Sequence, residues 1–246
     1  MRVAVVTGAS SGIGAALCRE LCRRGHHVVG LSRRPAPDAD EHEECDVADR
    51  ASVETAAARV LDRHPELTLL VCNAGIPARG DFLDTEPETI EAVMRTNYLG
   101  SVWCLRAFVP ALGAGASVVN VVSVAGVFAV GPYSASKHAQ LAFSRSLAVE
   151  LRPRGIHVLS VLPGFVETPG FPQGGRFPFP LSLLVARPQL VATRTADAVE
   201  RRRHEIYVPR WYRPAAWLQA LAPALIARRP ALPASGRSRS DTQARS

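Results

Sequence analysis

Residues 2–14 read RVAVVTGASSGIG, a short run of mostly apolar residues followed at once by a glycine-rich turn. A helical pattern then covers residues 15–24. A glycine-rich turn between a strand and a helix lets the backbone approach a pyrophosphate, which the N–H groups at the helix N-terminus attract. The stretch therefore predicts a dinucleotide-binding unit, although the turn by itself also fits an ordinary strand–helix connection. The turn residues predicted to contact the cofactor are Gly8, Ser10, Ser11, Gly12, Ile13 and Gly14.

The alternation of strands and helices continues to about residue 208. Strands are expected at 27–32, 67–72, 117–122 and 156–162, with a short strand ending near 45–47 and a candidate strand at 206–208, and helices at 49–63, 88–95, 97–112 and 133–151. Apolar strands that alternate with helices predict a parallel sheet buried on both faces. The predicted fold class is α/β, a single-domain Rossmann-type doubly wound parallel sheet flanked by helices on both faces, over residues 1–210.

The residues that follow the second predicted strand indicate which dinucleotide binds. An acidic residue there would hold the 2′-hydroxyl of NAD, whereas this chain has Arg33 and Arg34, whose guanidinium groups suit the 2′-phosphate of NADP. The pair predicts a preference for NADP(H). NAD(H) is the alternative if the two arginines are only solvated.

The string YSASK at residues 133–137 carries the chemistry. Tyr133 and Lys137 stand four residues apart, so a helix places the phenol and the ammonium group on one face. A nearby cation favours the phenolate and is expected to bring the tyrosine pKa, near 10 in model peptides, toward neutral pH. Lys137 is also the chain's only lysine, against 28 arginines, which points to a site that needs a compact ammonium group. Ser123, after the fifth predicted strand, could orient a substrate oxygen toward Tyr133.

Together these motifs resemble the short-chain dehydrogenase/reductase family in its single-domain branch. The matching pieces are TGASSGIG (7–14), CDV (45–47), CNAG (72–75), Asn97, VSVAG (122–126), YSASK (133–137) and PGFVETP (163–169). The resemblance implies a hydride transfer between NADP(H) and an alcohol or carbonyl carbon, with Tyr133 as general acid/base and no metal. It implies a homodimer or homotetramer built on the helices at 97–112 and 133–151.

The same resemblance assigns roles to further residues. Asn97 would kink its helix and hold a water linked to Lys137, which would also bind the nicotinamide ribose. Asp46 and Val47 would contact adenine, and Asn73, Ala74 and Gly75 would line the cofactor. The residues implied to cover the nicotinamide carboxamide are Pro163, Gly164, Val166 and Thr168.

Two segments depart from the family pattern. The loop between Ser123 and Tyr133 is shorter than in most members, which brings the catalytic geometry into question. Residues 168–190 occupy the place of a substrate-covering loop, and their Phe and Leu side chains indicate either a lid for a hydrophobic substrate or simple packing on the domain.

The C-terminal part carries the positive charge. Residues 201–246 hold ten arginines against Glu205 and Asp241, so their net charge is +8 and residues 1–200 carry −1 of the total +7. We therefore expect no nucleic-acid partner for the near-neutral domain. Residues 211–229 form an amphipathic segment that either packs on a protein surface or touches a membrane peripherally, and residues 230–246 are expected to be a disordered basic tail.

The five cysteines show no CxxC pairing, and no stretch approaches the roughly 20 apolar residues of a membrane span. We expect a cytoplasmic protein, with membrane association through residues 211–229 left open. Two alternatives to an active oxidoreductase are a catalytically impaired NADP(H)-binding regulatory or scaffold protein, which the short loop favours, and a sugar-nucleotide epimerase or dehydratase. The spacing of the glycine motif and the lack of a large C-terminal substrate domain count against the epimerase.

Overall fold

The computed structural model describes residues 1–78, 80–128, 131–169 and 185–221. These residues form one seven-stranded parallel sheet in the order β3-β2-β1-β4-β5-β6-β7. The strands are β1 (Arg2–Thr7), β2 (His26–Ser32), β3 (Glu41–Glu44), β4 (Leu67–Cys72), β5 (Leu112–Val121), β6 (His157–Pro163) and β7 (Glu205–Val208). The predicted Rossmann-type doubly wound sheet is confirmed, and the chain reverses its winding direction between β1 and β4.

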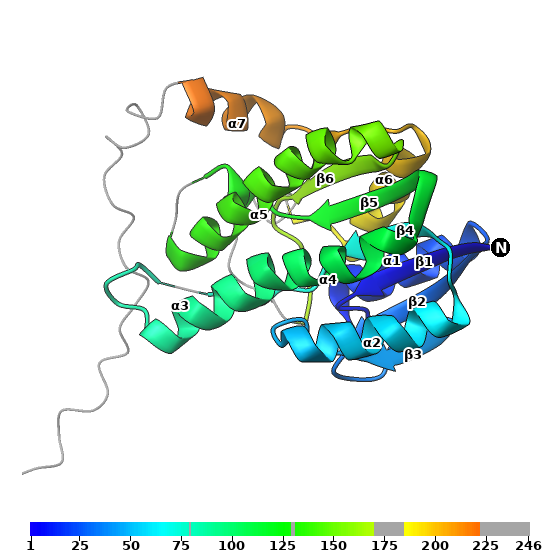
Figure 1. Cartoon of the computed structure of the whole chain (residues 1–246). Coiled ribbons are helices and arrows are strands. Elements are labelled where there is room, and N and C mark those ends of the chain that lie inside the picture. Colours follow the sequence, from blue (N-terminus) through cyan, green and yellow to red (C-terminus); the bar gives the residue numbers. More distant parts are fainter. Residues whose placement is uncertain (79, 129–130, 170–184, 222–246) are drawn as a thin grey trace, which may run out of the picture.

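Helices cover both faces of the sheet (Figure 1). They are α1 (Gly12–Arg23), α2 (Arg50–Arg63), α3 (Pro87–Met94), α4 (Gly100–Phe108), α5 (Gly131–Glu150), α6 (Pro188–Glu200) and α7 (Tyr212–Leu221). In Figure 1, α2, α4 and α5 lie on the near face, whereas α1 and α6 lie behind the sheet.

The period of two in β1 sends its side chains into two separate cores. Val3 and Val5 belong to the cluster under α2, α4 and α5, while Ala4 and Val6 belong to the cluster under α1 and α6. All four side chains are buried, as a parallel strand covered on both faces requires. The sheet is thereby fixed in register, and its strand ends meet at one edge.

Two strands, β3 and β5, differ from the sequence prediction by more than one residue at a boundary. β3 ends at Glu44, before the predicted 45–47, and Cys45 and Asp46 begin the loop to α2. β5 begins at Leu112 rather than at the predicted residue 117, because residues 113–115 (GAG) carry no strand pattern in the sequence. Its pairing with β4 shifts register between Leu67 and Leu69, which accommodates the extra residues.

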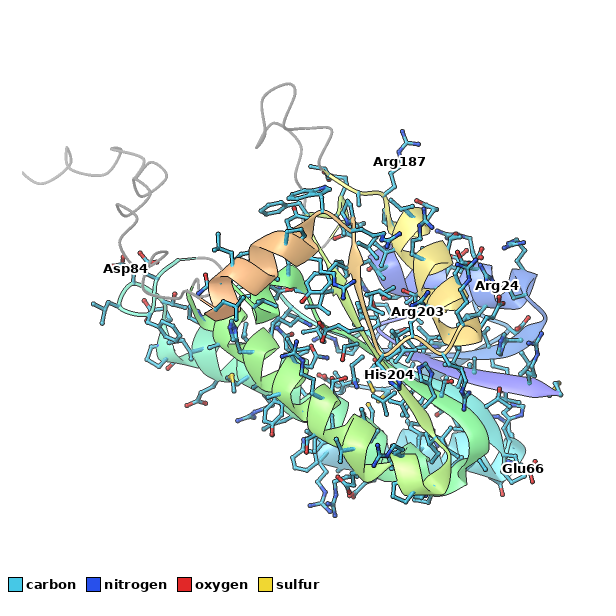
Figure 2. All side chains as sticks on the ribbon, turned by 90° about the horizontal axis from the view of Figure 1, so that it is seen from above. Arg24, Glu66, Asp84, Arg187, Arg203 and His204 are labelled. Atoms are coloured by element: carbon cyan, nitrogen blue, oxygen red, sulfur yellow. The ribbon has the colours of Figure 1, made fainter. Side chains whose placement is uncertain are left out.

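Helix α6 was not predicted, because its sequence PQLVATRTADAVE mixes small and polar residues in a weak pattern. Arg24, at the C-terminal end of α1, contacts it (Figure 2). The guanidinium group lies 2.6 Å from Asp197 and 2.8 Å from Glu200, both on α6. The buried Val and Ala side chains of α6 pack in one apolar cluster with those of α1, and two carboxylates of α6 bind the Arg24 cation.

Candidate active site

A cleft of about 1490 Å³ lies at the carboxyl ends of the strands. Predicted residues from every candidate segment line it: the glycine turn, Arg33 and Arg34, Asp46 and Val47, 73–75, Ser123, Tyr133, Lys137 and the segment 163–168. Gly14 and Asn97 do not line the cleft, because both are buried directly behind its wall. The strand ends of a doubly wound sheet therefore bring the separate motifs to one place.

The glycine turn leaves no room for side chains. Gly8 and Gly12 have φ values of +68° and +57°, which favour glycine. A Cβ on Gly14 would lie 2.1 Å from the Gly8 carbonyl oxygen. Asn73 joins the turn to β4, since its Nδ2 donates to the Thr7 carbonyl at 2.9 Å and its N–H donates to the Thr7 hydroxyl at 2.9 Å. The turn is thus packed backbone against backbone, and the N–H of Gly8 donates to the Leu31 carbonyl at 2.8 Å.

Arg33 stands at the far end of the cleft from Tyr133, where β2 ends. Its side chain is 69% exposed, and its Nη1 lies 3.9 Å from a carboxylate oxygen of Asp46. Asp46 accepts from the N–H of Ala48 at 3.0 Å, which fixes the loop after β3. Arg33 therefore places an exposed guanidinium at the rim beside the residues predicted to hold adenine.

Ser123, Tyr133 and Lys137 converge on one wall of the cleft. Ser123 and Tyr133 share a side-chain hydrogen bond, and the Ser123 hydroxyl also accepts from the N–H of Ala125 at 3.1 Å. The Lys137 Nζ lies 5.9 Å from the centre of the Tyr133 ring, on the same face of α5. The shortened loop after Ser123 thus still permits the contact between the serine and the tyrosine.

This arrangement agrees with the comparison to known proteins. The family model for short chain dehydrogenase matches residues 2–174. The chain belongs to the short-chain dehydrogenase family. It is accordingly an oxidoreductase of the Rossmann type, and the resemblance stated from its motifs is confirmed.

Relatives of this dehydrogenase include one from Streptomyces virginiae that carries the name "Monensin polyketide synthase putative ketoacyl reductase". It is 39% identical over 189 residues, which cover 68% of this chain and 72% of the relative. A short-chain dehydrogenase/reductase from Burkholderia phymatum in complex with NAD superposes with a TM-score of 0.81 at 26% identity, covering 95% of this chain and 98% of that one. A Burkholderia cenocepacia short chain dehydrogenase in complex with NADP gives a TM-score of 0.75 at 28% identity, covering 84% and 95%.

Burial shifts the pKa values of Tyr133 and Lys137 in opposite directions. It raises the pKa of Tyr133, an effect that the hydrogen bond from Ser123 opposes, and it lowers the pKa of Lys137 to about 7. In the protein without cofactor, the Tyr133 pKa is therefore raised, whereas the sequence analysis expected it to be lowered. The physical reason is that removal from water destabilises the phenolate, and the Lys137 ammonium is 5.9 Å from the ring centre and is itself poorly solvated.

Asn97 lies in a π-helical turn, Arg95–Leu99, between α3 and α4. Its side chain is fully buried and binds the backbone of Ile76 twice, accepting from the N–H at 2.8 Å and donating to the carbonyl at 3.0 Å. Its Nδ2 also donates to the Ser136 hydroxyl at 3.0 Å. Asn97 therefore ties the loop after β4 to α5, and the expected irregularity in its helix is present.

The sequence reasoning missed Tyr212, which lines the nicotinamide end predicted for the cleft. This side chain is buried against Gly164, where a Cβ would lie 2.1 Å from its ring. Tyr212 and Ala216 of α7 pack with Val122 and Leu162 of the same domain. Tyr212 and Ala216 thus pack on the domain, whereas Trp211 and Leu218 are 46% and 51% exposed, and membrane contact through this segment stays a prediction.

The lid predicted around 168–190 lies largely outside the described residues, as do 222–229 and the basic tail 230–246. Within the described part of the chain, none of the helices has the length and apolar character needed to cross a bilayer.

A polar cluster lies at the opposite end of the strands. The Nε2 atoms of His27 and His64 lie 2.7 Å and 2.8 Å from one carboxylate oxygen of Glu41, and Arg63 donates to its other oxygen at 3.0 Å. These donors lower the pKa of Glu41 to about 2, against the opposing effect of burial. His27, Glu41 and His64 have the donor types of a metal site. However, the two imidazoles bind the Glu41 carboxylate at hydrogen-bond distance, and Arg63 balances the charge of that carboxylate.

Proposed function

We propose that this chain transfers a hydride between NADP(H) and the carbon of a carbonyl or alcohol group, with Tyr133 as the general acid/base. The observation that carries the proposal is the convergence of Ser123, Tyr133 and Lys137 on the cleft whose floor is the glycine turn. A tyrosine can serve this role only where a neighbouring group stabilises its charged form, and Ser123 and Lys137 are both placed to do so.

The cleft fits a dinucleotide. Gly8, Gly12 and Gly14 form a cradle that a Cβ would fill, and the N-terminus of α1 would hold the pyrophosphate. Arg33 would bind a 2′-phosphate at the rim, while Asp46 and Val47 would border the adenine and Gly164 the nicotinamide. When bound, the cofactor supplies the hydride acceptor or donor.

The side chains of the protein would handle the proton. Ser123 would donate a hydrogen bond to the substrate oxygen and hold it beside the Tyr133 hydroxyl. Tyr133 would give its proton to that oxygen during reduction and take it back during oxidation. Lys137 would stabilise the phenolate that forms when the proton leaves, since an ammonium group nearby favours the charged form.

Apolar side chains line part of the cleft beside Ser123 and Tyr133. Val124, Phe128, Phe165 and Tyr212 line it beside the catalytic side chains. We propose a substrate with an apolar body, and the name of the 39%-identical Streptomyces relative makes ketoacyl compounds the first class to assay. A homodimeric or homotetrameric assembly is proposed from the family resemblance, and a cytoplasmic location is proposed from the unpaired pattern of the five cysteines.

The test is NADPH oxidation by the purified full chain across ketones, aldehydes and ketoacyl thioesters. We expect turnover of at least one apolar carbonyl compound, with stoichiometric formation of the alcohol. The regulatory alternative expects saturable NADPH binding without turnover across the whole panel, and that result would replace the enzymatic proposal.

Arg33→Ala is expected to reduce the preference for NADP(H). Loss of a charge-assisted contact to a phosphate costs about 1.5–3 kcal/mol, so the NADPH affinity should fall roughly tenfold to a hundredfold while NADH affinity stays within about twofold. Fluorescence titration of both cofactors measures the ratio. Arg50→Ala is the control, because Arg50 is an exposed arginine paired with Glu54 and does not line the cleft. An unchanged ratio in Arg33→Ala would remove Arg33 from the cofactor site.

A further inference from the structure

A chain of buried polar groups leads from Lys137 into the protein, away from the cleft. The Lys137 Nζ donates to the Gln140 Oε1 at 2.8 Å and to the Val121 carbonyl at 3.2 Å. The Gln140 Nε2 donates to the Ser101 hydroxyl at 2.8 Å, and that hydroxyl donates to the Asn97 carbonyl at 3.2 Å. Gln140 is fully buried and Ser101 is 4% exposed, so water does not compete for these contacts.

The direction of each hydrogen bond in this chain is fixed by chemistry. A carbonyl oxygen only accepts, so the Ser101 hydroxyl gives its proton to Asn97 and must accept from Gln140. The amide nitrogen of Gln140 therefore faces Ser101, and its oxygen faces Lys137. An ammonium group only donates, so the oxygen is the end of the amide that Lys137 requires.

The anchor of the chain is the π-helical turn that contains Asn97. Ser101 lies four residues after Asn97 and returns its hydroxyl to that carbonyl. The side chain of Asn97 is already occupied by Ile76 and Ser136, so its backbone carbonyl is the group that continues the path. Gln140 and Ser101 thus join Lys137 to the Asn97 carbonyl, two groups that the family resemblance implies are also linked by a water.

We propose that Gln140, oriented by Ser101, is a positioning residue that keeps the Lys137 side chain charged and directed at Tyr133. This inference rests on the proposed function of Tyr133 and adds two residues that act only through Lys137. Two of the three N–H donors of Lys137 are held by Gln140 and Val121, which leaves the third for the cleft that Lys137 lines. Gln140 thus supplies an acceptor that partly replaces the lost solvation of a buried ammonium group.

The electrostatic surroundings make this acceptor important. Burial lowers the Lys137 pKa to about 7, and no carboxylate among the described residues counters this shift. The titratable side chain that faces Lys137 is Tyr133, at 5.9 Å from the ring centre. A hydrogen bond to the charged form raises the pKa of a lysine, so removal of the Gln140 oxygen should make the ammonium lose its proton at lower pH.

The single lysine of the chain permits a direct measurement. Full-length protein without a lysine-containing tag, grown with lysine ¹³C-labelled at Cε, has one Lys side-chain signal, whose shift reports protonation during a pH titration. We expect the Lys137 pKa to fall by roughly one unit in Gln140→Leu and to rise by roughly one unit or more in Gln140→Glu, which adds a negative charge. Ser101→Ala should lower it by less, because the amide remains but loses its orientation.

Ser144→Ala is the matched control. Ser144 is as buried as Ser101 and also accepts from a buried amide, the Asn120 Nδ2 at 3.0 Å, yet it does not contact Lys137. The Lys137 pKa in the Ser144→Ala variant should equal that in the original chain. If Gln140→Leu does not fold, Gln140→Glu and Ser101→Ala decide the question. An unchanged Lys137 pKa in the folded Gln140 variants would overturn the proposal, as would an equal shift in Ser144→Ala.

The titration needs neither substrate nor cofactor, so absence of turnover would count against the proposed function alone. Once a substrate is known, the alkaline limb of kcat/KM against pH should move to lower pH in Gln140→Leu and to higher pH in Gln140→Glu. A limb that stays in place in both variants, while the Lys137 pKa shifts, would refute the positioning role.

Discussion

Tyr133→Phe is expected to lower kcat for carbonyl reduction by about 10²–10⁴-fold, the usual contribution of a positioned general acid. The substitution removes one hydroxyl and leaves the ring in place beside Lys137. Ser123 loses its hydrogen-bond partner but keeps the contact with the N–H of Ala125. NADPH affinity and the thermal unfolding midpoint should therefore change little, and steady-state kinetics together with a cofactor titration measure the separation.

Tyr207→Phe is the control for this prediction. Tyr207 is a buried tyrosine of β7 whose hydroxyl donates to Glu205 at 3.0 Å, and it does not line the cleft. Loss of the Tyr207 hydroxyl should leave kcat within about twofold of its original value, since no group at the reacting atoms changes. If Tyr133→Phe retained the original kcat, another acid would have to protonate the substrate oxygen.

The local motifs predicted the residues of the cleft wall that carries Tyr133 and Lys137, because their geometry follows from spacing along one element. Tyr133 and Lys137 are four residues apart, so any helix that contains them places them on one face. The strand before Gly8 and the helix after Gly14 fix the position of the glycine turn. The strand ends then assemble the site, since a parallel sheet puts all of its carboxyl ends at one edge.

The contacts that could not be predicted from the sequence join segments that lie far apart along the chain. Tyr212 belongs to a C-terminal pattern that fitted a membrane surface as well as a protein surface, and its packing on Gly164 depends on the path of the whole chain. Gln140 looked like one more residue of a long helix, and Ser101 like one of another. Their pairing follows only from the crossing of α4 and α5, which no local pattern specifies.

The protonation of Tyr133 was also beyond local reasoning. Helical spacing placed the ammonium near the phenol, but the pKa depends on how deeply both groups are buried, and that is set by the surrounding elements. Desolvation raises the tyrosine pKa and lowers the lysine pKa in the chain alone. The hydrogen bond from Ser123 to Tyr133 opposes the first effect, and we propose that the hydrogen bond from Lys137 to Gln140 opposes the second.

Gly14→Ala is expected to abolish tight cofactor binding. The new Cβ would lie 2.1 Å from the Gly8 carbonyl oxygen and 2.7 Å from the Asn73 Nδ2, so the backbone of the turn must shift. Overpacking of this kind costs about 1–3 kcal/mol of folding free energy. The shift also moves the N–H groups predicted to face the pyrophosphate, so we expect NADPH affinity to fall by roughly tenfold or more, equivalent to 1.4 kcal/mol.

Gly113→Ala separates the effect of the turn from the general effect of adding a methyl group. Gly113 lies at the start of β5, where a Cβ would meet nothing within 4 Å. Its NADPH affinity and unfolding midpoint should match those of the original chain. Because the Gly14 clash is with backbone, no rotamer change can relieve it, and the two alanine variants must differ if the turn is the cofactor cradle. Equal NADPH affinity in both would mean that the pyrophosphate does not lie on this turn.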